Sequence, residues 1–265
     1  MPVFVLVAGL MAVALAGCSE EEREKVSPLR PLQVKEQASS VLKGEGGYVV
    51  NWAGVLGNAN PWHFGEHVVA TIVAKDAKGA EVVRMDQPLD AVPPHGTLAF
   101  SGKAVAKVKP ETVSITYSQA KWNQAGRIPS AFQPFPVTDV VTKRQKNGGY
   151  LISGRVGTPY ERVAGTLAVT ALLRDAAGKL LGGASTFVDD VRSDAKQRFI
   201  VALDSVPKGV AKADVIARTW GSTSRPYEEL AMGGTVPVHT VKPKTPPFAK
   251  DRGRTLIPGV DTRPE

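Results

Sequence analysis

The sequence predicts an all-β protein with two similar antiparallel domains in tandem, and three observations support this prediction. From Pro31 onward, the 265-residue chain reads as short apolar runs separated by Gly, Pro, Asn and Asp, without a helical period. Several signatures recur about 100 residues apart, which indicates an internal repeat. The recurring signatures include turns typical of β-hairpins. A unit of about 100 residues with short strands at this density has the size of a β-sandwich.

The repeat is marked by matched pairs of signatures. They are residues 46–50 with 148–152, 75–79 with 174–178, Phe100 with Phe199, and Trp122 with Trp220. In both copies an Asp-Ala-x-Gly turn lies between two apolar runs. Because the aspartate can cap the turn and the glycine can adopt a positive φ, we expect a hairpin at each turn.

A further signature, a proline followed by a valine-containing strand, occurs at residues 31–34, 136–140 and 237–241. We expect no third domain after the last copy. We therefore expect that this strand can close a domain as well as open one. Strand 137–141 would then be shared by the two domains or would join them, and strand 236–241 would close the second domain.

These signatures give the expected domain boundaries. They are a leader at 1–17, a charged tether at 18–30, sandwich repeats at 31–126 and 136–241, a Pro-rich linker at 127–135, and a basic, Pro-rich tail at 242–265. The linker is expected to be extended and semi-rigid, and the tail to be disordered on its own.

The first eighteen residues are uncharged and end in Leu15-Ala16-Gly17-Cys18, which contains the only cysteine of the sequence. An apolar run that ends in small residues is typical of a secretory signal and its cleavage site. This ending resembles the lipobox of bacterial lipoproteins. The resemblance implies cleavage before Cys18, diacylation of its thiol, and a lipid-anchored location on the extracytoplasmic side of the bacterial envelope. Because the usual basic start is missing, an uncleaved transmembrane anchor or an ordinary secretory signal stays an alternative.

The repeats carry a second resemblance. Its elements are a strand with Gly54-Val55 or Gly154-Arg155-Val156, a run that ends in Asp-x-x-Gly, and a Pro-rich turn before an aromatic strand at 93–100. This order resembles the FxLYD-type domain of bacterial lipoproteins, although the second copy lacks the Pro-rich turn. The resemblance implies two tandem Ig-like sandwiches and supplies no catalytic residue.

The net charge of +8 lies entirely after the leader. Outside the cytoplasm, a basic surface meets anionic lipid heads, wall polymers or acidic glycans rather than chromosomal DNA, and charge alone specifies no partner. The expected partners are the membrane, through the N-terminal lipid, and an envelope protein or an anionic wall polymer. No nucleic acid is expected, and the oligomeric state is left open.

No catalytic residue and no cofactor are predicted. Residues 63–67, His-Phe-Gly-Glu-His, match a zinc-protease motif that requires a helix, but they are preceded by Pro61 and followed by β-branched residues. On a strand, histidines four residues apart are separated by ~13 Å, which is too far for one zinc ion. A metal site using His63, His67 and His95 is kept as the second alternative function.

The four tryptophans suggest an aromatic platform for carbohydrate. Trp122 and Trp220 occupy equivalent repeat positions, which favours core packing. Trp52 and Trp62 have no counterpart, and Trp62 lies in a predicted loop, so these two are the candidate ligand-binding residues. The sequence thus predicts a non-enzymatic binding or accessory module of the envelope. Binding of an envelope polymer or carbohydrate through Trp62 and Trp52 is the first alternative.

Overall fold

The computed structural model describes residues 28–44, 46–146 and 148–235. The first part contains β1 (Gln33–Gly44), β2 (Gly47–Gly57), β3 (His63–Glu66), β4 (Val69–Lys75), β5 (Glu81–Pro88), β6 (Thr97–Ala106), β7 (Thr112–Tyr117), β8 (Lys121–Gln124) and the short helix η1 (Pro129–Ala131). The second part contains β9 (Val137–Arg144), β10 (Tyr150–Val156), β11 (Ala164–Arg174), β12 (Leu180–Val191), β13 (Gln197–Leu203), β14 (Lys212–Thr219) and α1 (Arg225–Met232).

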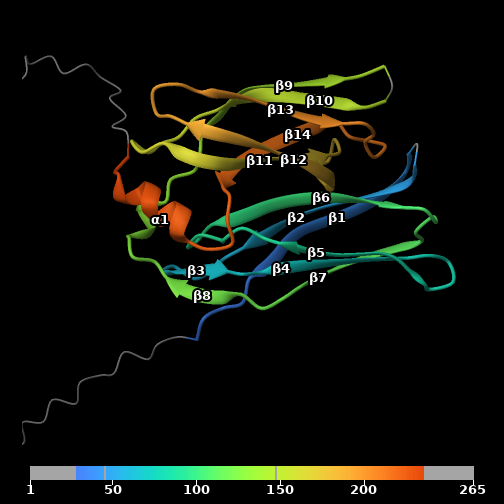
Figure 1. The fold of residues 1–265 in the computed structure, drawn as a ribbon, viewed down its shortest axis with the longest axis horizontal. Coiled ribbons are helices and arrows are strands. Elements are labelled where there is room, and N and C mark those ends of the chain that lie inside the picture. The colour runs from blue at the N-terminus through green and yellow to red at the C-terminus, as the bar shows by residue number, and fades with distance from the viewer. Residues whose placement is uncertain (1–27, 45, 147, 236–265) are drawn as a thin grey trace, which may run out of the picture.

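The sheets stack into four layers, two for each sandwich (Figure 1). From one outer face to the other, the layers are β5-β4-β7, β1-β2-β6, β12-β11-β14 and β13-β10-β9, and a small β3-β8 sheet lies at one end. All paired strands are antiparallel. The prediction of an all-β protein is confirmed.

Each sandwich has its own core, and central strands of the outer sheets, β4 and β10, bury every second residue toward it. In β4, for example, Ala70, Ile72 and Ala74 are buried, whereas Thr71 and Val73 between them are half-buried. The first core contains Trp52, Leu56, Ile72, Leu98 and Phe100, and the second contains Ile152, Leu167, Val169, Phe199 and Val201. This period of two is the pattern of a sheet that has one face on the core.

The matched signatures occupy matched places in the two sandwiches. Gly54 lies opposite Phe100 across β2 and β6, and Gly154 lies opposite Phe199 across β10 and β13. A Cβ atom on Gly54 would come within 2.7 Å of the Phe100 ring, and one on Gly154 within 2.6 Å of the Phe199 ring. Each glycine therefore leaves the space that the aromatic ring of its partner strand fills.

Both Asp-Ala-x-Gly turns form the predicted hairpins. Asp76 Oδ1 accepts hydrogen bonds from the backbone N–H groups of Lys78 and Ala80, each at 2.9 Å. In the second copy, Asp175 Oδ1 accepts from the N–H of Lys179 at 2.9 Å. The closing glycines have φ values of 83° and 88°, which explains why glycine ends both turns.

The expected connecting segments are bound to the sandwiches where the structure describes them. Arg30, at the end of the predicted tether, exchanges two backbone hydrogen bonds of 2.8 Å with the Asn60 amide. Phe135, at the end of the predicted linker, is 5% exposed and packs against Tyr160 and Tyr227 in the second core. Among the described strands, β9 pairs with β10 alone and so belongs to the second sandwich.

Several predictions concern residues outside the described ranges. These are the leader, the lipidated Cys18, the closing strand 236–241 and the tail. Within the described ranges, no helix combines the length and the hydropathy needed to cross a membrane.

The two sandwiches are joined by a third buried cluster. Ala53, Val55 and Ala99 of the first sandwich pack against Leu172 and Leu180 of the second. The sheets approach so closely that a Cβ atom on Gly183 of β12 would lie 3.1 Å from the Cβ of Ala53 and 3.2 Å from the Cβ of Ser101 in the first sandwich. Small side chains are therefore what permit this contact.

Polar contacts reinforce the joint at both ends. At one end, the Arg174 guanidinium donates to the Glu36 carboxylate at 2.9 Å and holds the pKa of that carboxyl below its ordinary value. At the other, Glu66 Oε1 accepts from the backbone N–H of Ser224 at 2.6 Å, just before α1. These contacts link the two sandwiches in addition to the apolar cluster.

Candidate functional site: a cleft between the sandwiches

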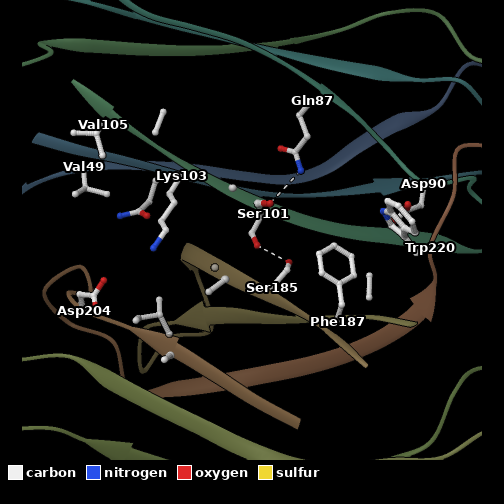
Figure 2. Close-up of a pocket in the computed structure, with 18 of the residues that line it drawn as sticks. Val49, Gln87, Asp90, Ser101, Lys103, Val105, Ser185, Phe187, Asp204 and Trp220 are labelled. Carbon is white, nitrogen blue, oxygen red and sulfur yellow. Dashed lines mark hydrogen bonds between the residues drawn. The ribbon is translucent and has the colours of Figure 1, made fainter. Parts of the chain in front are cut away.

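A cleft of about 640 Å³ opens between the facing sheets β1-β2-β6 and β12-β11-β14 (Figure 2). On β6, Leu98 and Phe100 pack in the first core. Ser101, Lys103 and Val105, on the opposite face of the strand, line the cleft. The opposite wall comes mainly from β12, the end of β14 and the loop after β13. The side chains that it contributes include Ser185, Phe187, Asp204, Arg218 and Trp220.

The floor of the cleft is a row of hydroxyl groups. Ser185 Oγ lies 2.8 Å from Ser101 Oγ in the first sandwich and 2.8 Å from Thr170 Oγ1 in the second. Gln87 Nε2 donates to the Ser101 carbonyl at 3.1 Å and so borders the same row. Because these hydroxyls satisfy one another, the floor is polar without an unpaired group, and it links the two sandwiches.

A buried ion pair fixes the backbone that carries Trp220. Arg218 Nε donates to Asp90 Oδ2 at 2.6 Å, and these side chains are only 11% and 8% exposed. Asp90 Oδ1 also accepts from the Gly221 N–H at 2.9 Å, and Arg218 NH1 donates to Thr170 Oγ1 at 2.7 Å. Trp220 lies between two residues that are both bound to Asp90. Its position is therefore set across the two sandwiches.

An exposed aromatic pair occupies one end of the cleft. Trp220 is 58% exposed and Phe187 is 57% exposed, and their ring centroids are 5.7 Å apart at an angle of 69°. An edge-to-face pair of this kind leaves ring surface free for a third group. Two large aromatic side chains left together in water on a rigid frame are a feature of binding sites rather than of a solvated surface.

The other end of the cleft combines charged side chains with the apolar side chains of Val49 and Val105. Figure 2 shows Lys103 and Asp204 there, on opposite walls and away from Phe187 and Trp220. Neither charged group makes a hydrogen bond or an ion pair with another residue that the structure describes, so both are available to a ligand. The cleft thus offers aromatic surface at one end and free hydrogen-bonding groups at the other.

The two tryptophans predicted to bind a ligand, Trp52 and Trp62, lie in different environments. Trp52 is 1% exposed, and its Nε1 donates to Gln87 Oε1 at 2.7 Å within the first core, so its proposed place at a ligand surface is corrected to a core position. Trp62 is 49% exposed just before β3, as expected for a loop residue, but it does not line the cleft. Its role in binding stays a prediction.

The expected core position of Trp220 is wrong. Its repeat partner Trp122 is half-buried on β8, where it pairs with Gly65 of β3. The second repeat continues from β14 into α1 instead of a strand equivalent to β8, so Trp220 lies in the connecting segment and faces solvent. The sequence signal that could have revealed this is Pro226, which favours a helix start soon after Trp220.

The histidines are spread over one end of the first sandwich. His63 begins β3, which confirms that residues 63–66 form a strand and not a helix. His67 and His95 lie outside the strands with φ values of 55° and 52°, and His67 Nδ1 is 3.5 Å from Ser222 Oγ. Within the described part of the chain, no three His, Cys, Asp or Glu side chains gather as a metal site.

Comparison with known proteins gives little. No protein-family model matches the sequence, and no curated protein matches it. Among solved structures, the chain is similar to the N-terminal CBM22-1–CBM22-2 tandem domain of Xyn10C from Paenibacillus barcinonensis, with 10% identity over 76% of this chain and 89% of that one. The TM-score of that match is 0.13, which is too low to indicate a shared fold.

Proposed function

We propose that this protein is a non-enzymatic binding module of the bacterial envelope that takes a glycan chain into the cleft between its sandwiches. The observation that carries the proposal is the exposed Phe187–Trp220 pair at one end of a cleft with free polar groups at the other. Ligand sites combine aromatic surface with a few placed polar groups. A sugar ring matches both, because its C–H face stacks on an aromatic ring while its hydroxyls exchange hydrogen bonds.

The charge of the protein supports a glycan of the envelope in particular. The net charge of +8 favours approach to polymers that carry acidic groups, and Lys103 places one free cation in the cleft itself. Asp204 and the amide of Asn51 supply hydrogen-bond acceptors for hydroxyls.

The location is part of the same proposal. The Leu15-Ala16-Gly17-Cys18 ending supports a lipid anchor on Cys18, which would hold the cleft close to envelope polymers. Metabolic labelling with palmitate tests this point directly. The wild-type protein should incorporate the label and a Cys18→Ala variant should not; equal labelling of both would exclude Cys18 as the acylated residue.

The binding test uses the full-length protein in detergent and two soluble probes, oligomers of β-1,4-linked N-acetylglucosamine and polygalacturonate, in isothermal titration calorimetry. Trp220→Ala should weaken binding at least ~10-fold, which equals ~1.4 kcal/mol. Trp62→Ala is the matched control, because Trp62 has similar exposure outside the cleft. The proposed site would be contradicted if neither probe bound, or if affinity fell in Trp62→Ala and not in Trp220→Ala.

A further inference from the structure

A second hollow also borders Trp220. It has a volume of about 410 Å³ and is bounded by the segment that enters β11, by Trp220, and by α1. Among the side chains that line the two hollows, only that of Trp220 borders both. Trp220, which the Asp90–Arg218 pair holds in place, therefore separates the cleft from the second hollow.

The second hollow has the same mixed chemistry as the cleft. Val163, 49% exposed, gives it apolar surface. Glu229 gives it a polar rim, where Arg225 Nε donates to Glu229 Oε1 at 2.6 Å in an exposed ion pair and Arg162 NH1 donates to the Glu229 carbonyl at 3.1 Å. Apolar surface beside a few polar groups is typical of ligand sites.

We propose that the two hollows are consecutive subsites for one chain-like ligand, an oligosaccharide that passes over Trp220 from the cleft toward α1. This inference rests on the proposed function, because it extends the same site. Each hollow falls within the ~300–1,000 Å³ that encloses one small ligand. Two such spaces that share a wall suit a polymer better than a single compact molecule.

The energetic consequence is a dependence on ligand length. Once the first segment of an oligosaccharide occupies the cleft, the next segment is held near the second hollow at a high effective concentration. A long oligomer should therefore bind more tightly than a short one without any new kind of contact. A ligand confined to the cleft would show no gain that depends on the second hollow.

Gly165 offers a way to close the second hollow alone. It lines that hollow, its φ is not in the left-handed region, and a Cβ atom built on it meets no atom within 4 Å. Leucine at this position fills open space without straining β11. Gly46 provides the matched control, since its Cβ also meets nothing within 4 Å and it lies outside both hollows.

The experiment compares the dimer and the octamer of β-1,4-linked N-acetylglucosamine by calorimetry on the full-length protein. In the wild type and in Gly46→Leu, the octamer should bind at least ~10-fold more tightly than the dimer. In Gly165→Leu, that gain should disappear while the affinity for the dimer stays unchanged, and circular dichroism should show unchanged folding.

The outcomes separate this inference from the proposed function. Equal affinity for dimer and octamer in the wild type, or an octamer gain that survives Gly165→Leu, would overturn the second subsite and leave the cleft as the binding site. Failure of both oligomers to bind would overturn this inference, and failure of polygalacturonate to bind as well would overturn the glycan function.

Discussion

The two sandwiches present equivalent faces of equivalent sheets, but they use them in opposite ways. In the first sandwich, Ala53, Val55 and Ala99 face the second sandwich and are buried against it. With Gly54 matched to Gly154 and Phe100 to Phe199, the equivalent positions in the second sandwich are Ser153, Arg155 and Arg198. They lie on the outermost layer, β13-β10-β9, and both arginines are exposed (Figure 1).

This difference explains why no further sheet of the described chain packs on the outer face of β13-β10-β9. Arg155 and Arg198 lie directly opposite one another in the register of β10 and β13. Like charges at opposite positions are unfavourable, and covering them with another sheet would add the cost of removing both from water. Small apolar side chains therefore permit sheet-on-sheet packing on one face, and a pair of arginines prevents it on the equivalent face. The cleft exists only because the first face is covered.

The strongest way to break this comparison is to place the arginine pair in the joint. Val55→Arg with Ala99→Arg buries two unpaired charges between the sandwiches and should destabilise their packing by about 3–5 kcal/mol. Small-angle X-ray scattering should show a larger radius of gyration, and thermal unfolding should shift to lower temperature.

The mirror substitution is the control for that experiment. Arg155→Val with Arg198→Ala gives the outer face the residues of the inner one and should leave the melting temperature almost unchanged. An equal loss of stability in both double variants would contradict the account of the two faces.

A smaller effect is expected from Gly183→Ala. The added methyl group would come within 3.1 Å of the Ala53 Cβ and 3.2 Å of the Ser101 Cβ across the joint, and should cost about 1–3 kcal/mol by overpacking it. Its neighbour Gly182 is the control, because the nearest atom to a Cβ there is 3.7 Å away. Chemical denaturation that finds both alanine variants equally stable would argue against close packing at Gly183.

The smallest effect concerns pH at the Arg174–Glu36 contact. Hydrogen bonding to Arg174 lowers the pKa of Glu36, so this contact stabilises the joint fully above the ordinary carboxyl pKa and is lost as pH falls through the lowered value. Because Glu36 is about one-third exposed, the contribution should be only ~0.2–1 kcal/mol. Between about pH 5 and pH 3, wild type should therefore lose slightly more stability than Glu36→Gln, and parallel pH curves would contradict this.

The sequence predicted the parts of the fold that depend on local chemistry. The Asp-Ala-x-Gly turns required a capping aspartate and a glycine with positive φ, and both are visible in the sequence. The sheet-on-sheet joint was not predictable in this way. Alternation along β6 marks Ser101 as facing away from the core, but it does not say that Ser185, 84 residues later, will cover it.

The tryptophans illustrate the same limit. Trp52 lies opposite Gly102, where a Cβ atom would approach the indole ring to 2.4 Å, so the glycine makes room for the ring inside the core. In the second sandwich the equivalent pair is Ile152 and Val201, which divides the volume differently. Trp52, which has no repeat counterpart, is therefore a core residue, whereas Trp220, which has one, faces the cleft. Trp220 lies there because the second repeat continues from β14 into α1, where the first repeat has β8.

The most direct test of the account is the change in tryptophan fluorescence when the octamer of N-acetylglucosamine is added to full-length wild type, Trp220→Phe and Trp62→Phe. If the cleft is the binding site, wild type and Trp62→Phe should show the same saturable change, and Trp220→Phe should show almost none. A full change in Trp220→Phe, or its loss in Trp62→Phe, would mean that the glycan binds outside the cleft.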